Sequence, residues 1–237
     1  MSACTMIVLA AGQGTRFGGP LPKQYLPLCH HPLLWHTLSR LHRHPQVGCI
    51  VPVIAPHGEA LWQQIMQPLL ADLPKVAAPV LGGTERQHSV FQALRSLPLA
   101  EDDWVGIHDG ARPLVDAAVL DRLLQARTQS DAIIPTLAAS DTVKQVDAHG
   151  HIIATLDRNS IHLAQTPQLF RFGLIHQAHQ QAAATQWLGT DDASLVERLA
   201  RPVLTVPGSA RTIKITQPLD WALAEWLLQE EEPCTGG

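Results

Sequence analysis

The sequence has few cysteines and no long apolar run, and these absences exclude several classes of protein. The four cysteines are widely spaced with no Cys-x-x-Cys pair, so neither a disulfide framework nor a zinc knuckle is expected. The N-terminus lacks the basic and apolar regions of a secretory signal, and no run of about 18 apolar residues predicts a membrane-spanning helix. We therefore expect a cytoplasmic protein without a membrane partner.

The net charge and the amino-acid composition exclude further classes of protein and binding partner. A net charge of −4 gives no basic surface for a polyanion, so nucleic acid is not expected as a partner. The 237 residues are 46% hydrophobic and 16% charged, which is ordinary for a globular domain with a substantial core. Among the 13 histidines, His176 and His179 could share a helix face, but the sequence places no carboxylate beside them, so no histidine metal site is expected.

Short apolar runs alternate with segments of helical periodicity along most of the chain. Strands are expected over residues 5–10, 49–55, 76–81, 104–108, 132–136, 202–206 and 212–215. Helices are expected over residues 32–44, 59–70, 87–97, 117–129, 173–186, 191–200 and 218–229. Such alternation predicts an α/β fold, a Rossmann-like three-layer α/β/α arrangement around a mostly parallel sheet.

Two short β-like runs, residues 142–146 and 151–156, interrupt this pattern around the turn sequence Asp147-Ala148-His149-Gly150. The core does not need this hairpin. It is either a protruding arm that packs on a second subunit, which we favour, or a simple antiparallel edge pair. The prediction is a single α/β domain of residues 1–136 and 160–230, a β-hairpin dimerisation arm of residues 137–159 and a flexible tail of residues 231–237.

A glycine-rich loop follows the first strand, and its backbone N–H groups could hold anionic oxygens. A dinucleotide fold requires G-x-G-x-x-G opening into a helix, but the glycine spacing here is wrong and Pro20 and Pro22 block that helix. A P-loop requires lysine where Pro20 stands. The remaining interpretation is a triphosphate closed on by two long cations, Arg16 and Lys23, which would stabilise charge at the α-phosphorus.

A carboxylate, Asp109, ends the apolar run 104–108, at the strand end where open α/β sheets bind ligands. It could coordinate Mg²⁺ together with triphosphate oxygens, or it could cap a helix; we favour the metal. Asp191 presents the same choice between supporting a metal and capping a helix, and both alternatives stay open.

The opening segment LAAGQGTRFGGPLPKQYLPL (9–28) resembles the signature of the 2-C-methyl-D-erythritol 4-phosphate cytidylyltransferase family. The short form A-A-G-x-G-x-R is shared with other sugar-phosphate nucleotidyltransferases, whereas P-K-Q-Y-L narrows the resemblance to this family and its pentitol-phosphate relatives. Further similar segments are GGTERQHSV (82–90), HDGARP (108–113), DTVK (141–144), DR (157–158), QTPQ (165–168) and IKIT (213–216). The resemblance covers about residues 5–228.

The resemblance implies the fold of the nucleotide-diphospho-sugar transferases and a role for each matching residue. Catalysis would fall to Arg16 and Lys23, and Mg²⁺ would bind Asp109. The nucleotide, CTP, would contact Ala10, Ala11, Gly12, Gly14, Gly83, Thr84, Ser89 and Gly110. The acceptor, 2-C-methyl-D-erythritol 4-phosphate, would contact Arg112, Thr142, Arg158, Thr166 and Lys214.

In this family the arm of one subunit reaches the active site of the other, so the resemblance implies a homodimer in which Thr142 and Arg158 act in trans. The implied reaction yields 4-diphosphocytidyl-2-C-methyl-D-erythritol and pyrophosphate, in non-mevalonate isoprenoid biosynthesis. Two alternatives stay open at this stage: a pentitol phosphate such as ribitol 5-phosphate as acceptor, and a nucleotide-binding regulatory protein without turnover. The joint presence of Arg16, Lys23, Asp109 and Lys214 argues against the second.

Overall fold

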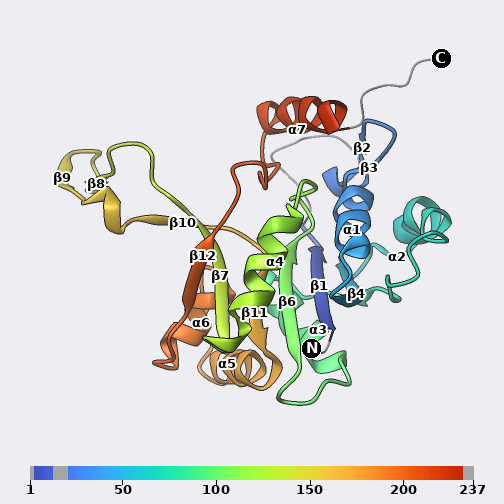
Figure 1. Ribbon diagram of the computed structural model, residues 1–237, viewed down its shortest axis with the longest axis horizontal. Coiled ribbons are helices and arrows are strands. Elements are labelled where there is room, and N and C mark those ends of the chain that lie inside the picture. Colours follow the sequence, from blue (N-terminus) through green and yellow to red (C-terminus); the bar gives the residue numbers. More distant parts are fainter. Residues whose placement is uncertain (1–2, 13–20, 232–237) are drawn as a thin grey trace.

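An eight-stranded sheet runs through the molecule in the computed structural model, which describes residues 3–12 and 21–231 (Figure 1). The strand order is β10-β7-β11-β6-β1-β4-β5, and β12 pairs with β7. The strands are β1 (Cys4–Ala10), β4 (Val47–Ile54), β5 (Val80–Leu81), β6 (Trp104–Asp109), β7 (Ala132–Ala138), β10 (His162–Ala164), β11 (Gln168–Arg171) and β12 (Leu204–Pro207).

The direction of chain progress reverses next to β1. Strands β4 and β5 add in parallel on one side of β1, and β6 adds in parallel on its other side. This is a topological switch point, and ligands of open α/β sheets bind outside the carboxyl ends of the strands there. The register pairs Leu9 with Asp109 and Ala10 with Ile54, so the ends of β1, β4 and β6 meet at one edge.

Helices cover both faces of the sheet, which confirms the three-layer prediction (Figure 1). One face packs on α1 (Leu33–Arg43) and α4 (Ala117–Gln125). The other packs on α3 (Arg86–Ser96), α5 (Phe172–Ala184) and α6 (Asp192–Arg198). Alternate residues of β1 enter the two cores, Met6 and Val8 on the first face and Ile7 on the second, as the period of a strand requires.

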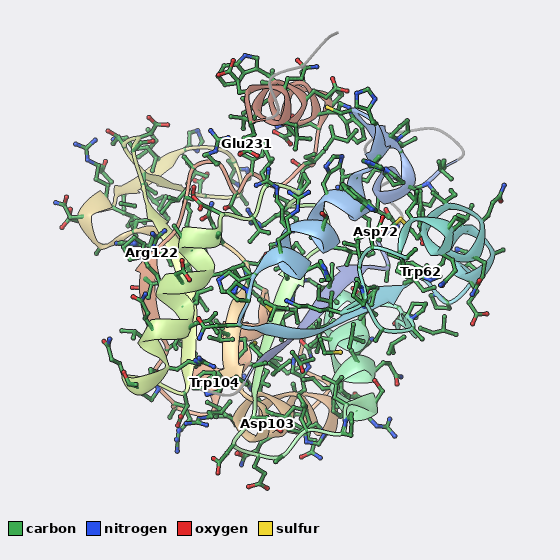
Figure 2. The ribbon with its side chains drawn as sticks, turned by 45° about the vertical axis from the view of Figure 1, so that its right-hand side comes forward. Trp62, Asp72, Asp103, Trp104, Arg122 and Glu231 are labelled. Atoms are coloured by element: carbon green, nitrogen blue, oxygen red, sulfur yellow. The ribbon has the colours of Figure 1, made fainter. Side chains whose placement is uncertain are left out.

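A third, smaller core lies above the carboxyl edge. There α7 (Pro218–Glu231) packs its Ala224 and Leu227 against Leu28 and Leu33, near the short pair β2 (Pro27–Leu28) and β3 (His31–Pro32). Glu231 ends this helix (Figure 2). Its carboxylate pairs with Arg40 and with Arg211. The helix therefore includes the first residue of the predicted tail, and residues 232–237 lie outside the described part.

Several expected elements differ from the structure. The segment 59–70 divides into α2 (Glu59–Leu61), a π-helical turn η2 (Trp62–Met66) and a 3₁₀ turn η3 (Gln67–Leu69), where Pro68 cannot donate a helical hydrogen bond. The strand expected over 76–81 is reduced to β5 and an isolated bridge between Ile50 and Val76. Residues 212–215 form no strand.

Two strands of the sheet, β10 and β11, were not predicted from the sequence. These two strands follow one another along β7 and are antiparallel to it, and β11 also pairs antiparallel with β6. The sheet is therefore mixed although mostly parallel. The remaining short turns are η1 (Lys23–Tyr25), η4 (Ala126–Thr128) and η5 (Arg158–Ser160).

A β-hairpin projects away from the sheet between β7 and β10 (Figure 1). Its strands β8 (Lys144–Val146) and β9 (Ile152–Thr155) are antiparallel and shorter than expected. The turn forms as predicted: the backbone N–H groups of His149 and His151 donate to Oδ1 of Asp147, and Gly150 has a φ of 85°. Val146, Ile152 and Ile153 are more than half exposed, at 52%, 62% and 59%.

Candidate active site

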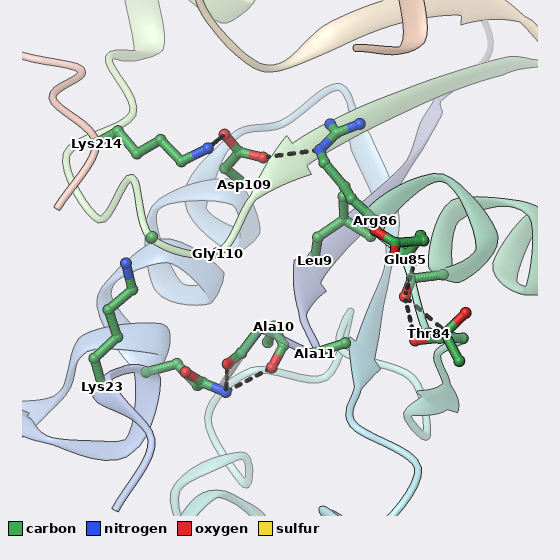
Figure 3. Close-up of a pocket in the computed structure, with 15 residues that line it drawn as sticks. Leu9, Ala10, Ala11, Lys23, Thr84, Glu85, Arg86, Asp109, Gly110 and Lys214 are labelled. Atoms are coloured by element: carbon green, nitrogen blue, oxygen red, sulfur yellow. Dashed lines mark hydrogen bonds and ion pairs between the residues drawn. The ribbon is translucent and has the colours of Figure 1, made fainter. Parts of the chain in front are cut away.

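A cavity of about 260 Å³ opens at the switch point, beyond the ends of β1 and β6 (Figure 3). Backbone and side chains from five segments surround it: the end of β1, the η1 turn, the turn before α3 with the first turn of that helix, the turn after β6, and the segment between β12 and α7. Its lining residues are Leu9, Ala10, Ala11, Gly12, Lys23, Gln24, Gly83, Thr84, Glu85, Arg86, Ser89, Asp109, Gly110, Ala111 and Lys214.

Close backbone contact between β1 and β6 shapes the floor of this cavity. The N–H of Gly110 donates to the carbonyl of Leu9 at 2.9 Å. A Cβ at Gly110 would lie 2.7 Å from that oxygen and 3.1 Å from Leu34 Cδ1. Glycine at this position therefore permits the close approach of the two strands.

The Gly-Gly turn before α3 is tightly closed on itself. The hydroxyl of Ser89 accepts from the Gly83 N–H at 3.1 Å and donates to the Glu85 carbonyl at 3.0 Å. A Cβ at Gly83 would lie 2.5 Å from the Cβ of His88. Ser89 thus fixes the turn that lines the cavity, beside the exposed Thr84, whose hydroxyl lies 3.0 Å from His88 Nδ1.

Asp109 ends β6 and faces three cations. Its carboxylate lies 2.9 Å from Lys214 Nζ, 3.5 Å from Arg86 Nε and 3.6 Å from Arg112 Nε. Burial alone would raise the pKa of this carboxyl, but the positive charges of Arg86 and Lys214 hold the pKa well below its usual range. The group is therefore an anion at neutral pH, in the position that the sequence analysis assigned to a metal ligand.

Arg86 connects the cavity to the helices behind it. Its Nη1 lies 2.7 Å from Asp192 Oδ2, and the side chain of Asp192 is only 1% exposed. The other oxygen of Asp192 lies 3.3 Å from His179 Nε2. A carboxylate therefore does accompany His179, contrary to the sequence expectation, but in the described part of the chain no three His, Cys, Asp or Glu side chains gather to hold a metal.

His108 is fully buried beneath Asp109 and bonded at both ring nitrogens. The Arg112 carbonyl, 3.2 Å from Nε2, can only accept, so Nε2 carries the proton of the neutral ring and donates to it. Nδ1 therefore accepts from the Thr166 hydroxyl 3.0 Å away, and the same hydroxyl oxygen accepts from the Asp109 N–H at 3.1 Å. Burial lowers the pKa of His108 to about 4, so the ring is neutral at physiological pH.

Lys23 and Arg112 are held by the segment between β12 and α7. Lys23 Nζ donates to the carbonyl of Ile215 at 2.6 Å, and Arg112 Nη1 donates to the carbonyl of Thr212 at 2.8 Å. These side chains donate hydrogen bonds to the carbonyls of Ile215 and Thr212, which in a strand would accept from the backbone of a neighbouring strand. This explains why residues 212–215 form no strand. Lys23, Asp109 and Lys214 consequently lie around one cavity although they are far apart in sequence.

The structure brings together most of the predicted site residues. Ten of them line the cavity: Ala10, Ala11, Gly12, Lys23, Gly83, Thr84, Ser89, Asp109, Gly110 and Lys214. Arg112 and Thr166 lie directly behind Asp109. Arg16 and Gly14 lie outside the described residues.

Thr142 and Arg158 do not line this cavity; Arg158 is bonded to the Ser140 carbonyl at the base of the arm. Asp191 caps α6 in a reciprocal capping box with Ser194, which favours the capping alternative. Two lining residues, Gln24 and Arg86, were not predicted as site residues, although both lie within the matching segments 9–28 and 82–90. The signal for the glutamine was its place in the P-K-Q-Y-L motif, directly after Lys23.

A model of the protein family described as 2-C-methyl-D-erythritol 4-phosphate cytidylyltransferase matches residues 4–230. The chain belongs to this family. Membership confirms the prediction of a nucleotidyltransferase enzyme, and the matched range spans the arm as well as the α/β domain.

Individual relatives agree with the family match over nearly the full chain. The 2-C-methyl-D-erythritol 4-phosphate cytidylyltransferase of Geotalea uraniireducens is 46% identical over 226 residues, covering 95% of this chain and 96% of that protein. The crystal structure of the Francisella tularensis enzyme superimposes with a TM-score of 0.80 at 32% identity, covering 95% and 99%. A 4-diphosphocytidyl-2C-methyl-D-erythritol synthase structure from Anaerococcus prevotii gives 0.83 at 29% identity, covering 96% of each chain.

Proposed function

We propose that this chain transfers CMP from CTP to 2-C-methyl-D-erythritol 4-phosphate, giving 4-diphosphocytidyl-2-C-methyl-D-erythritol and pyrophosphate. The single observation that supports this most is the convergence of Lys23, Lys214 and an ionised Asp109 on one cavity at the switch point of the sheet. The family to which the chain belongs supplies the substrates that fit that arrangement.

The reaction needs charge stabilisation more than proton transfer. A phosphate oxygen of the acceptor attacks the α-phosphorus of CTP, and the bond from that phosphorus to the bridging oxygen of pyrophosphate breaks. The attacking oxygen is already anionic at neutral pH, so no strong general base is required. This agrees with His108, the buried histidine nearest Asp109, which has both nitrogens engaged and no free position to act as a base.

The cations around the cavity have separate roles in this proposal. Lys23, together with Arg16 from the sequence, stabilises the negative charge that develops at the α-phosphorus. Lys214 and Arg112 bind the acceptor's phosphate, with Thr166 at the same side of Asp109. Ala10, Ala11 and Gly12 let the triphosphate approach the backbone, and the Gly83–Ser89 turn holds the base and ribose.

We propose Mg²⁺ as the divalent ion, held by Asp109. A single buried carboxylate that stays ionised fits this ion, since Mg²⁺ in such enzymes commonly binds one or two carboxylates plus substrate phosphates. When bound, the ion would neutralise triphosphate oxygens and withdraw electrons from the α-phosphorus. The surrounding arginines keep the carboxylate ionised and oriented toward the cavity.

We also propose a homodimer in which the arm of one subunit brings Thr142 and Arg158 to the other subunit's cavity. Two observations support it: neither residue lines the cavity of its own chain, and the arm exposes apolar side chains without a partner in the described residues. The part of the chain that the structure describes contains no helix long and apolar enough to cross a membrane. Cytoplasmic location remains a prediction.

Pyrophosphate release tests the proposed reaction. The purified chain is incubated with CTP and Mg²⁺, and the acceptor is either 2-C-methyl-D-erythritol 4-phosphate or ribitol 5-phosphate. We expect release that depends on the methylerythritol acceptor and that is at least about a hundredfold slower with ribitol phosphate. Faster release with ribitol phosphate would assign the chain to a pentitol acceptor, and CTP binding without release would assign it a binding role alone.

A further inference from the structure

Gln24 lies one residue after Lys23 and is almost completely buried, with 5% of its surface exposed. Its amide Nε2 donates to two backbone carbonyls, that of Ala10 at 2.7 Å and that of Gly12 at 3.0 Å. Both acceptors belong to the segment that leaves β1 and lines the cavity. One side chain therefore uses both of its amide hydrogens to fix the path of this segment.

These bonds decide which way the peptide groups of the segment face. In a trans peptide the carbonyl and the following N–H point in opposite directions. Because the Ala10 carbonyl turns toward Gln24, the N–H of Ala11 lies on the opposite side of that peptide. Carbonyl oxygens carry negative partial charge and would repel a triphosphate. By bonding two of them, Gln24 offsets that charge and fixes the Ala11 N–H on the opposite side of its peptide.

The same short turn also positions the catalytic lysine. Lys23 and Gln24 are consecutive in η1, and they are bonded in different directions: Gln24 to the end of β1 and Lys23 to the carbonyl of Ile215. The turn is closed by the Tyr25 N–H donating to the Pro22 carbonyl at 2.9 Å. The hydrogen bonds of Gln24 thus set the location of the Lys23 backbone relative to the phosphate-binding segment.

We propose that Gln24 is a positioning residue for the triphosphate. This proposal rests on the proposed function in one respect only, that CTP is the ligand. It acts through the Ala10–Gly12 backbone and touches no reacting atom. A purely structural role would change the unfolding temperature and affect all ligands equally. A positioning role weakens binding in proportion to the number of phosphates, because only the phosphates contact the segment that Gln24 orients.

The test compares Gln24→Met with Gln87→Met. Gln87 makes the same number of backbone hydrogen bonds, to the Trp187 carbonyl and from the Gly189 N–H, but it does not line the cavity. Dissociation constants for CTP, CMP and cytidine are measured by calorimetry with Mg²⁺ present. We expect Gln24→Met to weaken CTP about tenfold, CMP less and cytidine under about twofold, and Gln87→Met to leave all three within about twofold.

A second variant, Gln24→Glu, keeps the side-chain shape and tests the proposal if methionine prevents folding. Its carboxylate would face the two carbonyls, so we expect a larger loss of CTP affinity than for methionine and a KM for CTP that rises more than kcat falls. Equal losses for CTP and cytidine, or unchanged CTP affinity, would overturn the proposal. Because binding is the readout, these results stand even if the wild-type chain releases no pyrophosphate.

Discussion

The ammonium of Lys214 lies 2.9 Å from Oδ2 of Asp109, so the residue assigned to the acceptor is paired with the residue assigned to the metal. The side chain of Lys214 is 44% exposed and that of Asp109 11% exposed, which leaves the lysine free to move while the carboxylate stays fixed. A divalent ion and the lysine would both be attracted to the same oxygen, and two cations cannot occupy one position. Arrival of the ion would therefore release Lys214 toward the acceptor's phosphate.

Substituting Lys214→Gln removes the competing cation from Asp109. We expect the Mg²⁺ concentration for half-maximal rate to fall about threefold to tenfold, since a partly exposed ion pair contributes on the order of 1 kcal/mol. The KM for the acceptor should rise at the same time, because its phosphate loses a partner. Metal titrations of pyrophosphate release check both effects, with Lys75→Gln, a lysine outside the cavity, as the control. An unchanged metal requirement would mean that Lys214 and the ion do not compete.

Substituting Lys23→Ala removes one of the two cations, with Arg16, that we propose to stabilise charge at the α-phosphorus. We expect kcat to fall about a thousandfold or more, because preorganised charge is the largest contribution to this kind of transfer. The fold should survive, because loss of the hydrogen bond to the Ile215 carbonyl costs only about 1 kcal/mol and Lys23 is not part of the apolar cores. Single-turnover rates and thermal unfolding are measured together. Near-wild-type turnover of the folded variant would remove Lys23 from the mechanism.

Mixing two inactive variants tests whether the arm acts in trans. In the proposed dimer, Lys23→Ala should disable the cavity of its own chain, and Arg158→Ala should disable the arm that the chain lends to its partner. A mixed dimer then contains one intact site, so a random equimolar mixture should recover about a quarter of the wild-type rate. The mixture is refolded together and assayed against each variant alone. Recovery no greater than the average of the two parents would place Arg158 with its own chain's site.

Acid pH should destabilise the protein through His108, whose pKa is about 4 in the folded state against 6.5 when unfolded. Between these values the unfolded chain binds a proton that the folded chain excludes, so the free energy of unfolding falls as pH falls from 6.5 to 4. The loss is at most about 3 kcal/mol. The lowered pKa of Asp109 acts in the same direction, but only below about pH 4.

Denaturant titrations of the wild type and His108→Asn across that range isolate this contribution. The variant has no group to protonate at this position, so its unfolding free energy should depend less on pH between 6.5 and 4. The other histidines are common to both proteins and cancel in the comparison. Parallel curves for the two proteins would show that His108 is not the group responsible.

Much of the fold could be predicted because its parallel strands are short apolar runs between helices of clear periodicity. β10 and β11 could not, because Gln168–Arg171 holds only two apolar residues and its strand exists through pairing with β6 and β7, which is a long-range contact. At residues 212–215 the reverse happened: a strand was predicted from the local sequence, but long-range contacts prevent it. The alternation of Ile213, Lys214 and Ile215 is typical of a strand, yet side chains occupy the carbonyls of Thr212 and Ile215.

The site residues that could be predicted are those whose charged side chain by itself indicates a role in binding phosphate or metal. Asp109, Lys23 and Lys214 are such residues, and the structure places all three at one cavity. Arg86 and Gln24 were not predictable in this way. Arg86 is placed by the buried carboxylate of Asp192, over 100 residues later in the chain, and Gln24 acts on backbone atoms that any sequence would possess.

The side chains that set this site take main-chain carbonyls as their partners: Lys23 that of Ile215, Arg112 that of Thr212, and Gln24 those of Ala10 and Gly12. A carbonyl does not change when its residue is replaced. Ile215 can therefore be exchanged for another packing residue without removing the partner of Lys23. In a saturation mutagenesis of the chain, the donors should tolerate few replacements and the acceptor positions many. The identity of the acceptor residue therefore carries no information about these hydrogen bonds. Only the donor side chain can be recognised from the sequence.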